Sequence, residues 1–325
     1  MLVNDNDIKV SILVPIYGVE KYIEKCAISL MEQTYMNIEY IFVNDCTKDS
    51  SIDILKRVIS CYPERQPYTK ILNHICNRGL AAARNTAVDA CSGDYLMHVD
   101  SDDWLVNDAV EKLIAFAEEK NSDVVLFGNY NVYRDHQEES KASYSDKTSY
   151  ISGILLHTIP ASIWNKFYKT AFYKESGIRS IEGINHGEDY VVVPRLLHKA
   201  KNIDVLNELL YFYNLTNQSS YTQNVTLKSI ESVHSAFEVV YEYFNGVDDK
   251  HEYTATMKVL PLRSMLALIK TASKENYGDI LNLYAQYLEV DSRRLSKSDK
   301  LILFLLKAKQ FYTLNCLIKL YKHFK

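Results

Sequence analysis

The chain lacks a long hydrophobic run. In its 325 residues, the longest candidate run near the C-terminus is Leu301 to Leu306, whereas a helix needs about 20 apolar residues to span a bilayer. The first ten residues, MLVNDNDIKV, do not combine a basic start with an apolar core, as a signal peptide would. We therefore expect a cytoplasmic protein.

The chain also lacks a strong excess of either charge. Its formal net charge is -4, with 24% charged and 47% hydrophobic residues. This composition allows a packed core. A chain this close to neutral has no overall basic field, which argues against nucleic acid as the main partner.

Two kinds of motif are missing. The six cysteines form no CxxC pair, although Cys46, Cys61, Cys76 and Cys91 recur every 15 residues. We expect free thiols, with a zinc site as the alternative. The segment PIYGVEKY after the first expected strand contains neither GxGxxG nor a glycine-rich phosphate loop. Its composition argues against a dinucleotide-dependent oxidoreductase and against a sugar nucleotidyltransferase.

What the chain does contain is an alternation of apolar strands and amphipathic helices. We expect strands at 10–16, 38–43, 70–73 and 94–99, with helices at 19–31, 51–60 and 79–90. This order is typical of a doubly wound α/β sheet that is largely parallel at its start.

The later part of the chain is less regular. We expect a helix at 108–120, a strand at 123–127, a polar surface loop at 134–150, a helix at 187–199 and a strand at 209–213. Strand signals stop near Thr226, so a boundary is placed near residue 222.

Ligands of open α/β sheets bind beyond the carboxyl ends of the strands. Here those ends carry Pro15 to Tyr17, Asn44-Asp45, and Asp100 to Asp103. Asp100 and Asp102 share a face of an extended chain, and clustered carboxylates repel each other unless a cation lies among them. Mg²⁺ or Mn²⁺ bridging a diphosphate suits such ligands. A helix cap with a solvated turn is the alternative.

Six segments in order resemble the inverting glycosyltransferase family 2. They run from residue 8 to about 220 and read VSILVPIYGVEKYIEKCAISLMEQTY, IEYIFVNDCTKDSS, NRGLAAARN, GDYLMHVDSDDWL, IWNKFYKTAF and GEDYVVVPRLL. The last hundred residues show no such match. The resemblance implies a GT-A, Rossmann-like doubly wound sheet in residues 1–222, with a nucleotide-binding half at about 1–105 and an acceptor half at about 106–222. A helical region, 223–325, follows.

The resemblance also implies roles for single residues. Tyr17 would stack on the nucleotide base, and Asp45 would hydrogen-bond the base, usually uracil, although Asn44 departs from the family's Asp-Asp pattern. Asp102 would bind the metal. The remaining nucleotide-sugar positions are Pro15, Arg84, Asn85 and Asp100, of which Asp100 also belongs to the metal motif. A core aromatic is the alternative for Tyr17, and a helix-surface ion pair is the alternative for Arg84.

A second acidic pair, Glu188 and Asp189, matches the family's catalytic motif. A sugar hydroxyl needs a base to remove its proton, and Asp189 matches that base. Helix N-terminal stabilisation is the alternative for both acids. Trp164 and Lys166 match positions that would contact the acceptor, with a packed Trp and a surface Lys as the alternative. The family often has a metal-binding histidine near Tyr211 to Tyr213, and this chain has none there.

The stretch from Ser296 to Lys325 has seven lysines and one acid among many apolar residues. Such a stretch suits an amphipathic helix on an anionic membrane surface, so the protein could lie on the inner face of the cell membrane. A packed helical hairpin with a solvated basic face is the alternative.

The function implied by the resemblance is transfer of a hexose or N-acetylhexosamine from a UDP-sugar to a saccharide or lipid-linked saccharide acceptor. The reaction would invert the anomeric centre, use Mn²⁺ or Mg²⁺, and serve bacterial surface polysaccharide synthesis. The alternatives are a catalytically degenerate GT-A scaffold or sugar-binding protein, and a sugar nucleotidyltransferase.

Overall fold

The computed structural model describes residues 8–217, 226–289, 292 and 295–323. The chain folds into two compact units. The first comprises the described residues of Met1–Lys147, Ser162–Gly183 and Arg195–Gln218, and the second those of Thr148–Ala161, Ile184–Pro194 and Ser219–Lys325. The expected boundary near residue 222 lies outside the described residues.

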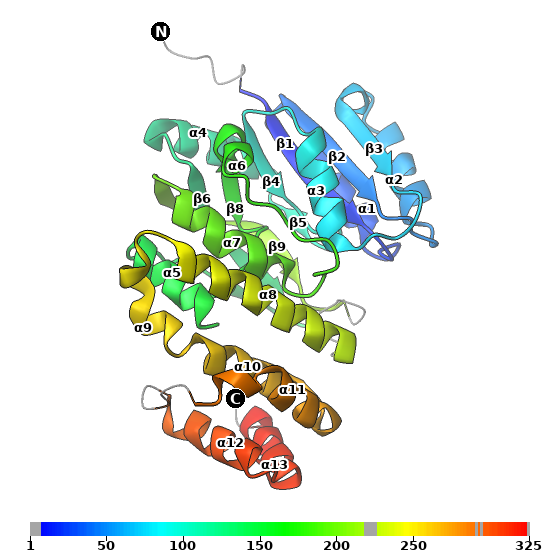
Figure 1. The fold of residues 1–325 in the computed structure, drawn as a ribbon. Helices are drawn as coiled ribbons and strands as arrows, with labels where there is room; N and C mark the ends of the chain where they lie inside the picture. The colour runs from blue at the N-terminus through cyan, green and yellow to red at the C-terminus, as the bar shows by residue number, and fades with distance from the viewer. Residues whose placement is uncertain (1–7, 218–225, 290–291, 293–294, 324–325) are drawn as a thin grey trace. The chain divides into compact units, whose positions relative to one another are not determined.

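The first unit is built on a nine-stranded sheet (Figure 1). Its order is β3-β2-β1-β4-β8-β6-β9-β5, with β7 paired to β6. The strands are β1 Val10–Ile16, β2 Ile38–Asn44, β3 Thr69–Asn73, β4 Tyr95–His98, β5 Trp104–Leu105, β6 Val124–Val132, β7 Gln137–Ser140, β8 Lys166–Lys169 and β9 Ile203–Asn214. β1 runs parallel to β2 and β4, and β2 runs parallel to β3. The prediction of a parallel start is therefore confirmed.

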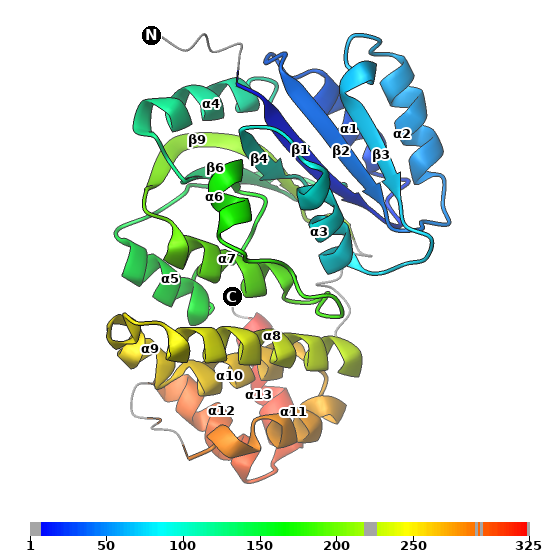
Figure 2. The ribbon, with the colours of Figure 1, turned by 45° about the horizontal axis from the view of Figure 1, so that its top comes forward.

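Helices cover both faces of the parallel strands (Figure 2). Alternate residues of β1, from Val10 to Ile16, pack with buried residues of α1 Ile23–Met31, α2 Ser51–Ser60 and α4 Ala109–Lys120. On the other face, α3 Leu80–Ala90 contacts β1 and β2. Burial of both strand faces explains why most residues of β1 and β2 are apolar.

A buried glutamate joins three strands at the amino ends of the parallel strands. Glu39 on β2 is 2% exposed, accepts a hydrogen bond from Ser11 Oγ at 2.6 Å and pairs with Lys9 Nζ at 3.0 Å. It also accepts the backbone N–H of Gly93 at 3.1 Å, where a Cβ would clash with the backbone of β1. Burial alone would raise the pKa of Glu39, but the hydrogen bonds from Ser11, Ser92 and Lys9 lower it to about 2.

The polar stretch at 134–150 was wrongly expected to be only a loop. It contains β7 and the start of α5 Lys147–Leu155. β7 reads QEES and is exposed along three of its four residues, so it pairs with β6 without any apolar pattern. β8 and α6 Thr170–Glu175 were not predicted from the sequence, because they are too short to show a period.

The second unit is helical among its described residues. It contains α5, the start of α7 Glu188–Lys199, and a C-terminal series of helices, so the predicted C-terminal helical region is confirmed. The series is α8 Leu227–Gly246, α9 Thr254–Met257, α10 Leu260–Thr271, α11 Tyr277–Leu283, α12 Lys297–Lys307 and α13 Phe311–His323. None of the described helices is both long enough and apolar enough to span a bilayer.

Candidate active site

The turns after β1 and β2 are tied together. Gly18, in the left-handed region at φ 70°, donates its N–H to Thr47 Oγ1 at 2.9 Å. Thr47 in turn donates to Asp49 Oδ1 at 2.8 Å. These bonds present Tyr17 at the surface, where it is 47% exposed. The alternative that Tyr17 is a core aromatic is therefore wrong.

Asp45, at the end of β2, is 2% exposed and organises the loop that leads into α3. Its Oδ1 accepts the N–H of Arg78 at 2.8 Å, and its Oδ2 accepts the N–H of Gly79 at 2.7 Å. The ring of His74 lies 2.7 Å from Oδ1 and reaches Thr86 Oγ1 at 2.9 Å through its other nitrogen. Asp45 thus fixes the turn that starts α3, a role that the sequence analysis missed because these partners are about 30 residues away.

Arg84 and Asp100 form an ion pair with an N–O distance of 3.0 Å. The Arg84 side chain is 3% exposed and that of Asp100 is 25% exposed. The pair is therefore buried on the arginine side, unlike the surface pair considered as an alternative. Burial, reinforced by Arg84, lowers the pKa of His98 on β4 well below its ordinary value.

The three acids after β4 have different surroundings. Asp102 Oδ2 accepts a hydrogen bond from Asn217 Nδ2 at 2.8 Å. Asp103 points into the protein, where it accepts the hydroxyl of Tyr211 and the N–H of Asn214, both at 2.7 Å. Burial raises the pKa of Asp102, and Asp100 raises it further.

The segment where the family often has a histidine contacts this acidic turn. Tyr211 also accepts the N–H of Asp100 at 3.1 Å, and Asn214 Nδ2 donates to the carbonyl of Asp102 at 3.1 Å. The roles of Tyr211, Asn214 and Asn217 were not predicted from the sequence, where a histidine was the expected site residue of this segment. Asparagine and tyrosine side chains are the signal that could have found them, because both donate hydrogen bonds to carboxylates.

The electrostatics of the acidic turn favour a divalent cation, but the grouping of its side chains does not by itself indicate a metal site. Burial and the neighbouring Asp100 both raise the pKa of Asp102, and a cation would offset this cost of ionising Asp102. Among the residues that the structure describes, however, no three His, Cys, Asp or Glu side chains are grouped as metal ligands. Both carboxylate oxygens of Asp103 accept hydrogen bonds inside the protein, so Asp102 and Asp100 are the acids of this turn that would bind a cation. Other positions would be filled by diphosphate or water oxygens.

The two expected acceptor residues are packed rather than exposed. Trp164 is 8% exposed, and its ring stacks on Tyr211 at 4.5 Å and on Tyr213 at 5.0 Å between centroids. Lys166 is fully buried and donates from Nζ to Asn165 Oδ1 at 2.7 Å and to the carbonyl of Ser162. The alternative that Lys166 is a surface lysine is therefore wrong. The alternative that Trp164 is a packed side chain agrees with its burial.

Asn85 and Pro15 are held within the fold of the first unit. Asn85 Nδ2 donates to the carbonyl of Ser180 at 2.8 Å, and its Oδ1 accepts the N–H of Ser180 at 3.2 Å. Pro15 lies next to the last residue of β1, opposite Val43 of β2. Asn85 thus ties α3 to the segment at Ser180, whereas Pro15 belongs to the carboxyl end of β1.

Glu188 and Asp189 begin α7 and belong to the second unit. The turn before them is held to α8, because Ser232 Oγ accepts the N–H of His186 and donates to its carbonyl, both at 3.1 Å. Gly187 has φ 95°, and a Cβ there would lie 3.1 Å from that of Ala236. A cavity of about 190 Å³ beside this turn is lined partly by Gly187 and Tyr190. Both acids lie in the first turn of the helix, as the alternative of helix stabilisation also requires.

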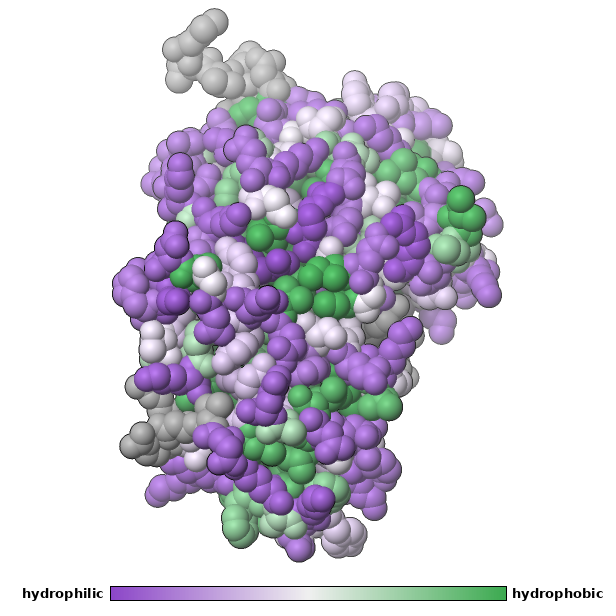
Figure 3. Space-filling model, in the orientation of Figure 1, coloured by the Kyte–Doolittle hydropathy of each residue, from purple (hydrophilic) through white to green (hydrophobic). Residues whose placement is uncertain are grey.

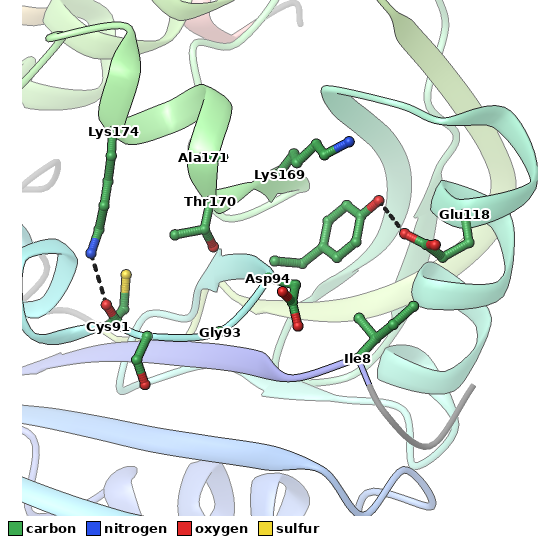
Figure 4. Close-up of a pocket in the computed structure, with 11 residues that line it drawn as sticks. Ile8, Cys91, Gly93, Asp94, Glu118, Lys169, Thr170, Ala171 and Lys174 are labelled. Atoms are coloured by element: carbon green, nitrogen blue, oxygen red, sulfur yellow. Dashed lines mark hydrogen bonds between the residues drawn. The ribbon is translucent and has the colours of Figure 1, made fainter. Parts of the chain in front are cut away.

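Another cavity, of about 460 Å³, lies in the first unit at the amino end of β4 (Figure 4). Asp94 and Tyr95 from the start of β4 line it, together with Lys169 and Lys174. Lys174 Nζ donates to the carbonyl of Cys91 at 2.8 Å. Because it lies at the amino end of β4, this cavity is separate from the acidic turn at the carboxyl end.

Three comparisons place this chain among known proteins. The profile of "Glycosyl transferase family 2" matches residues 11–180. GlyA of Streptococcus pneumoniae, a glycosyltransferase, is 32% identical over 233 residues, which are 67% of this chain and 32% of GlyA. This chain therefore spans about a third of the length of that relative.

Solved structures share the fold. TarS of S. aureus, residues 1–349 with UDP-GlcNAc, superposes with a TM-score of 0.71 at 20% identity, covering 98% of this chain and 93% of that one. TarS is named a poly(ribitol-phosphate) beta-N-acetylglucosaminyltransferase. The mannosyltransferase PcManGT of Pyrobaculum calidifontis, with GDP-Man and Mn²⁺, superposes with a TM-score of 0.56 at 13% identity, covering 96% and 84%.

The mixed sheet with a parallel start and the helical C-terminal region define a protein with the GT-A fold. The profile match covers more than half of the chain, and the chain belongs to glycosyl transferase family 2, a family of sugar-transferring enzymes.

Proposed function

We propose that this protein transfers a hexose or N-acetylhexosamine from a UDP-sugar to a saccharide acceptor, with inversion of the anomeric centre. The observation that carries the proposal is the set of residues at the carboxyl ends of β1, β2 and β4. An exposed aromatic ring at Tyr17, the buried Asp45 and the acidic turn from Asp100 all belong to this edge of one sheet. Bound UDP-GlcNAc in the structure of TarS supports a UDP-sugar donor.

The nucleotide would be held at the first two strand ends. Tyr17 offers a ring face for the base, and Pro15 and Asp45 shape the turn below it. Asp45 already accepts two backbone N–H groups, but its carboxylate oxygens have further lone pairs. We propose that Asp45 selects uracil by accepting a hydrogen bond from the base with one of these lone pairs. Arg84 and Asn85 would position Asp100 and the neighbouring loop rather than reach the donor themselves.

Asp102 and Asp100 would hold Mn²⁺ or Mg²⁺ beside the diphosphate of the donor. Such a cation offsets the negative charge that develops on the leaving diphosphate. Asn217 would keep the Asp102 carboxylate in one orientation through its 2.8 Å hydrogen bond. The Mn²⁺ in the structure of PcManGT supports the presence of a metal in this fold.

Asp189 would accept the proton of the attacking hydroxyl, and Glu188 would orient the acceptor or its neighbours. A single displacement needs a base of this kind, because a sugar hydroxyl is a weak nucleophile at neutral pH. Glu188 is 8% exposed and starts the helix, so it is placed to orient rather than to exchange protons with solvent. Trp164 and Lys166 would shape the acceptor side through their packed loop.

We propose a saccharide, free or lipid-linked, as the acceptor, in the synthesis of a bacterial surface polysaccharide. The polymer acceptor in the name of TarS supports this class. The two acidic pairs favour a working enzyme over a degenerate scaffold, since a scaffold needs neither pair.

A donor screen tests the proposal. Purified protein is incubated with UDP-, GDP- and dTDP-sugars, with Mn²⁺ and with excess chelator, and nucleotide release is measured. We expect release from a UDP-sugar that requires the metal. Release from no donor, together with formation of a nucleotide-sugar from a sugar phosphate and UTP, would identify a nucleotidyltransferase instead.

Replacing Asp189 with Asn tests the base. The variant is nearly isosteric but cannot take the proton, so kcat should fall by at least about 10²-fold while donor binding survives. Asp279→Asn is the matched control, because Asp279 is also an acid in the first turn of a helix, α11, and is exposed. If Asp189→Asn keeps a near-normal kcat and Glu188→Gln is inactive, the base is Glu188 instead.

A further inference from the structure

The hairpin of α12 and α13 exposes apolar side chains that its own packing does not require. On α12, Ile302, Leu303 and Leu306 are buried. Leu301 and Phe304, one turn apart on the other side of the helix, are 46% and 67% exposed. Figure 3 shows hydrophobic residues among hydrophilic ones over the C-terminal helices.

The helix α13 repeats this arrangement. Tyr312 is 73% exposed and Leu320 is 58% exposed, and Cys316 between them is exposed as well. These three residues recur every four positions, so they follow one side of the helix. The buried positions Leu314 and Ile318 lie on the other side.

Lysines flank the exposed apolar residues of α12. Lys297, Lys300 and Lys307 are all exposed. Lys297 precedes Leu301 by four positions, while Lys300 and Lys307 lie four before and three after Phe304. Lysine side chains so placed can extend beside the apolar stripe and keep their charged ends in contact with water or headgroups.

The exposed charged side chains of the hairpin, over the part whose side chains are described, are lysines. Asp299 is the single acid between Leu295 and Leu320, the part of the hairpin whose side chains are described, and it is 2% exposed. It pairs with Lys270 Nζ at 2.6 Å and with Arg263 Nη1 at 2.9 Å, both on α10. Its charge is thus neutralised inside the second unit, and the exposed charges of the hairpin are positive.

We propose that the α12–α13 hairpin binds the surface of an anionic phospholipid membrane, with Leu301 and Phe304 among the headgroups and the lysines on lipid phosphates. Helices that bind at the surface of an anionic membrane carry apolar side chains on one face and basic side chains beside them. A protein partner would need acids for the lysines and a pocket for Phe304, whereas a bilayer supplies both charge and apolar depth. This inference goes beyond sugar transfer and does not depend on it.

Vesicle binding tests the inference with the full chain. The protein is sedimented with vesicles of phosphatidylcholine alone and of phosphatidylcholine with phosphatidylglycerol. We expect binding to the anionic vesicles, weakened by salt, and none to the neutral ones. Each lysine near the surface contributes about fivefold to partitioning, so Lys297→Glu with Lys300→Glu should weaken binding by at least about 20-fold.

Leu301→Ser with Phe304→Ser should weaken binding by at least about tenfold, because these side chains lose the gain of leaving water. Two matched double variants of the first unit are the controls. Met36→Ser with Tyr68→Ser removes exposed apolar groups, and Lys56→Glu with Lys120→Glu makes the same change in charge; both should bind as the parent does.

Three outcomes would overturn the proposal. One is no binding of the parent protein to anionic vesicles at low salt. Another is equal loss in the control variants, which would make the effect one of total charge or general surface polarity. The third is a parent protein that forms dimers without lipid and becomes monomeric in Leu301→Ser with Phe304→Ser, which would make the hairpin an interface between copies.

Discussion

Glu39 should contribute a stabilisation that disappears in acid. Its pKa in the folded protein is about 2, against an ordinary value of 4.5. A difference of this size corresponds to about 3 kcal/mol of stability. Because the folded pKa is lowered, this contribution is present above pH 4.5 and is lost as the pH falls toward 2.

The variant Glu39→Gln isolates the charge. At pH 7 it should be less stable than the parent by up to about 3 kcal/mol, because Lys9 and the N–H and O–H donors lose a charged acceptor. As the pH falls from 5 to 2, the difference between the two proteins should shrink toward zero. The fold around Gly93 should be retained, since the amide has nearly the same shape as the carboxylate.

Denaturation followed by tryptophan fluorescence measures this difference. Trp104 and Trp164 are the two tryptophans of the chain, and both lie in the first unit with Glu39. Glu24→Gln is the matched control, because Glu24 also pairs with a basic side chain at 3.0 Å but is 55% exposed. Exposed pairs contribute about 0 to 1 kcal/mol. A constant difference in stability between Glu39→Gln and the parent from pH 7 to pH 2 would show that the charge of Glu39 does not stabilise the fold.

Three further predictions concern the active site. Asn217→Ala should weaken Mn²⁺ binding by roughly 10- to 100-fold, measured by electron paramagnetic resonance, because Asp102 loses its orienting partner; unchanged affinity would remove that role. Because burial raises the pKa of Asp102, protonation should weaken Mn²⁺ binding at a higher pH than it would for an ordinary aspartate. A midpoint of this loss of Mn²⁺ affinity below pH 4 would contradict the prediction. UDP should bind more tightly than GDP in calorimetry, and Asp45→Ala should lose that preference; equal affinities in the parent would end the assignment.

The parallel half of the sheet was predictable because its signals are local. β1 and β2 are buried on both faces, so most of their residues are apolar, and α1 and α2 show the period of a helix that covers one face. The acidic turn was found for the same reason, since Asp100 follows directly after an apolar strand. Short strands such as β8, with four residues, carry no comparable period.

The partners of the site residues were not predictable, because they come from distant parts of the chain. Asn217 is 115 positions from Asp102, and Gly79 is 34 positions from Asp45. The burial of Lys166 was also unpredictable, since nothing in WNKFYK shows that its amine turns back to Ser162. The sequence identifies the acids, and only the fold shows which of them the protein itself already engages.

Binding of UDP to the parent protein and to Asp102→Asn, each with Mn²⁺ and with excess chelator, tests whether the acidic turn holds a metal that binds the nucleotide. We expect Mn²⁺ to tighten UDP binding to the parent, and the asparagine variant to lose this gain while keeping its metal-free affinity. Asp53→Asn, an exposed acid in the first turn of α2, should behave as the parent does. Equal UDP affinity of the parent with Mn²⁺ and with chelator, or a full metal effect in Asp102→Asn, would contradict a metal-dependent nucleotide-sugar site at this turn.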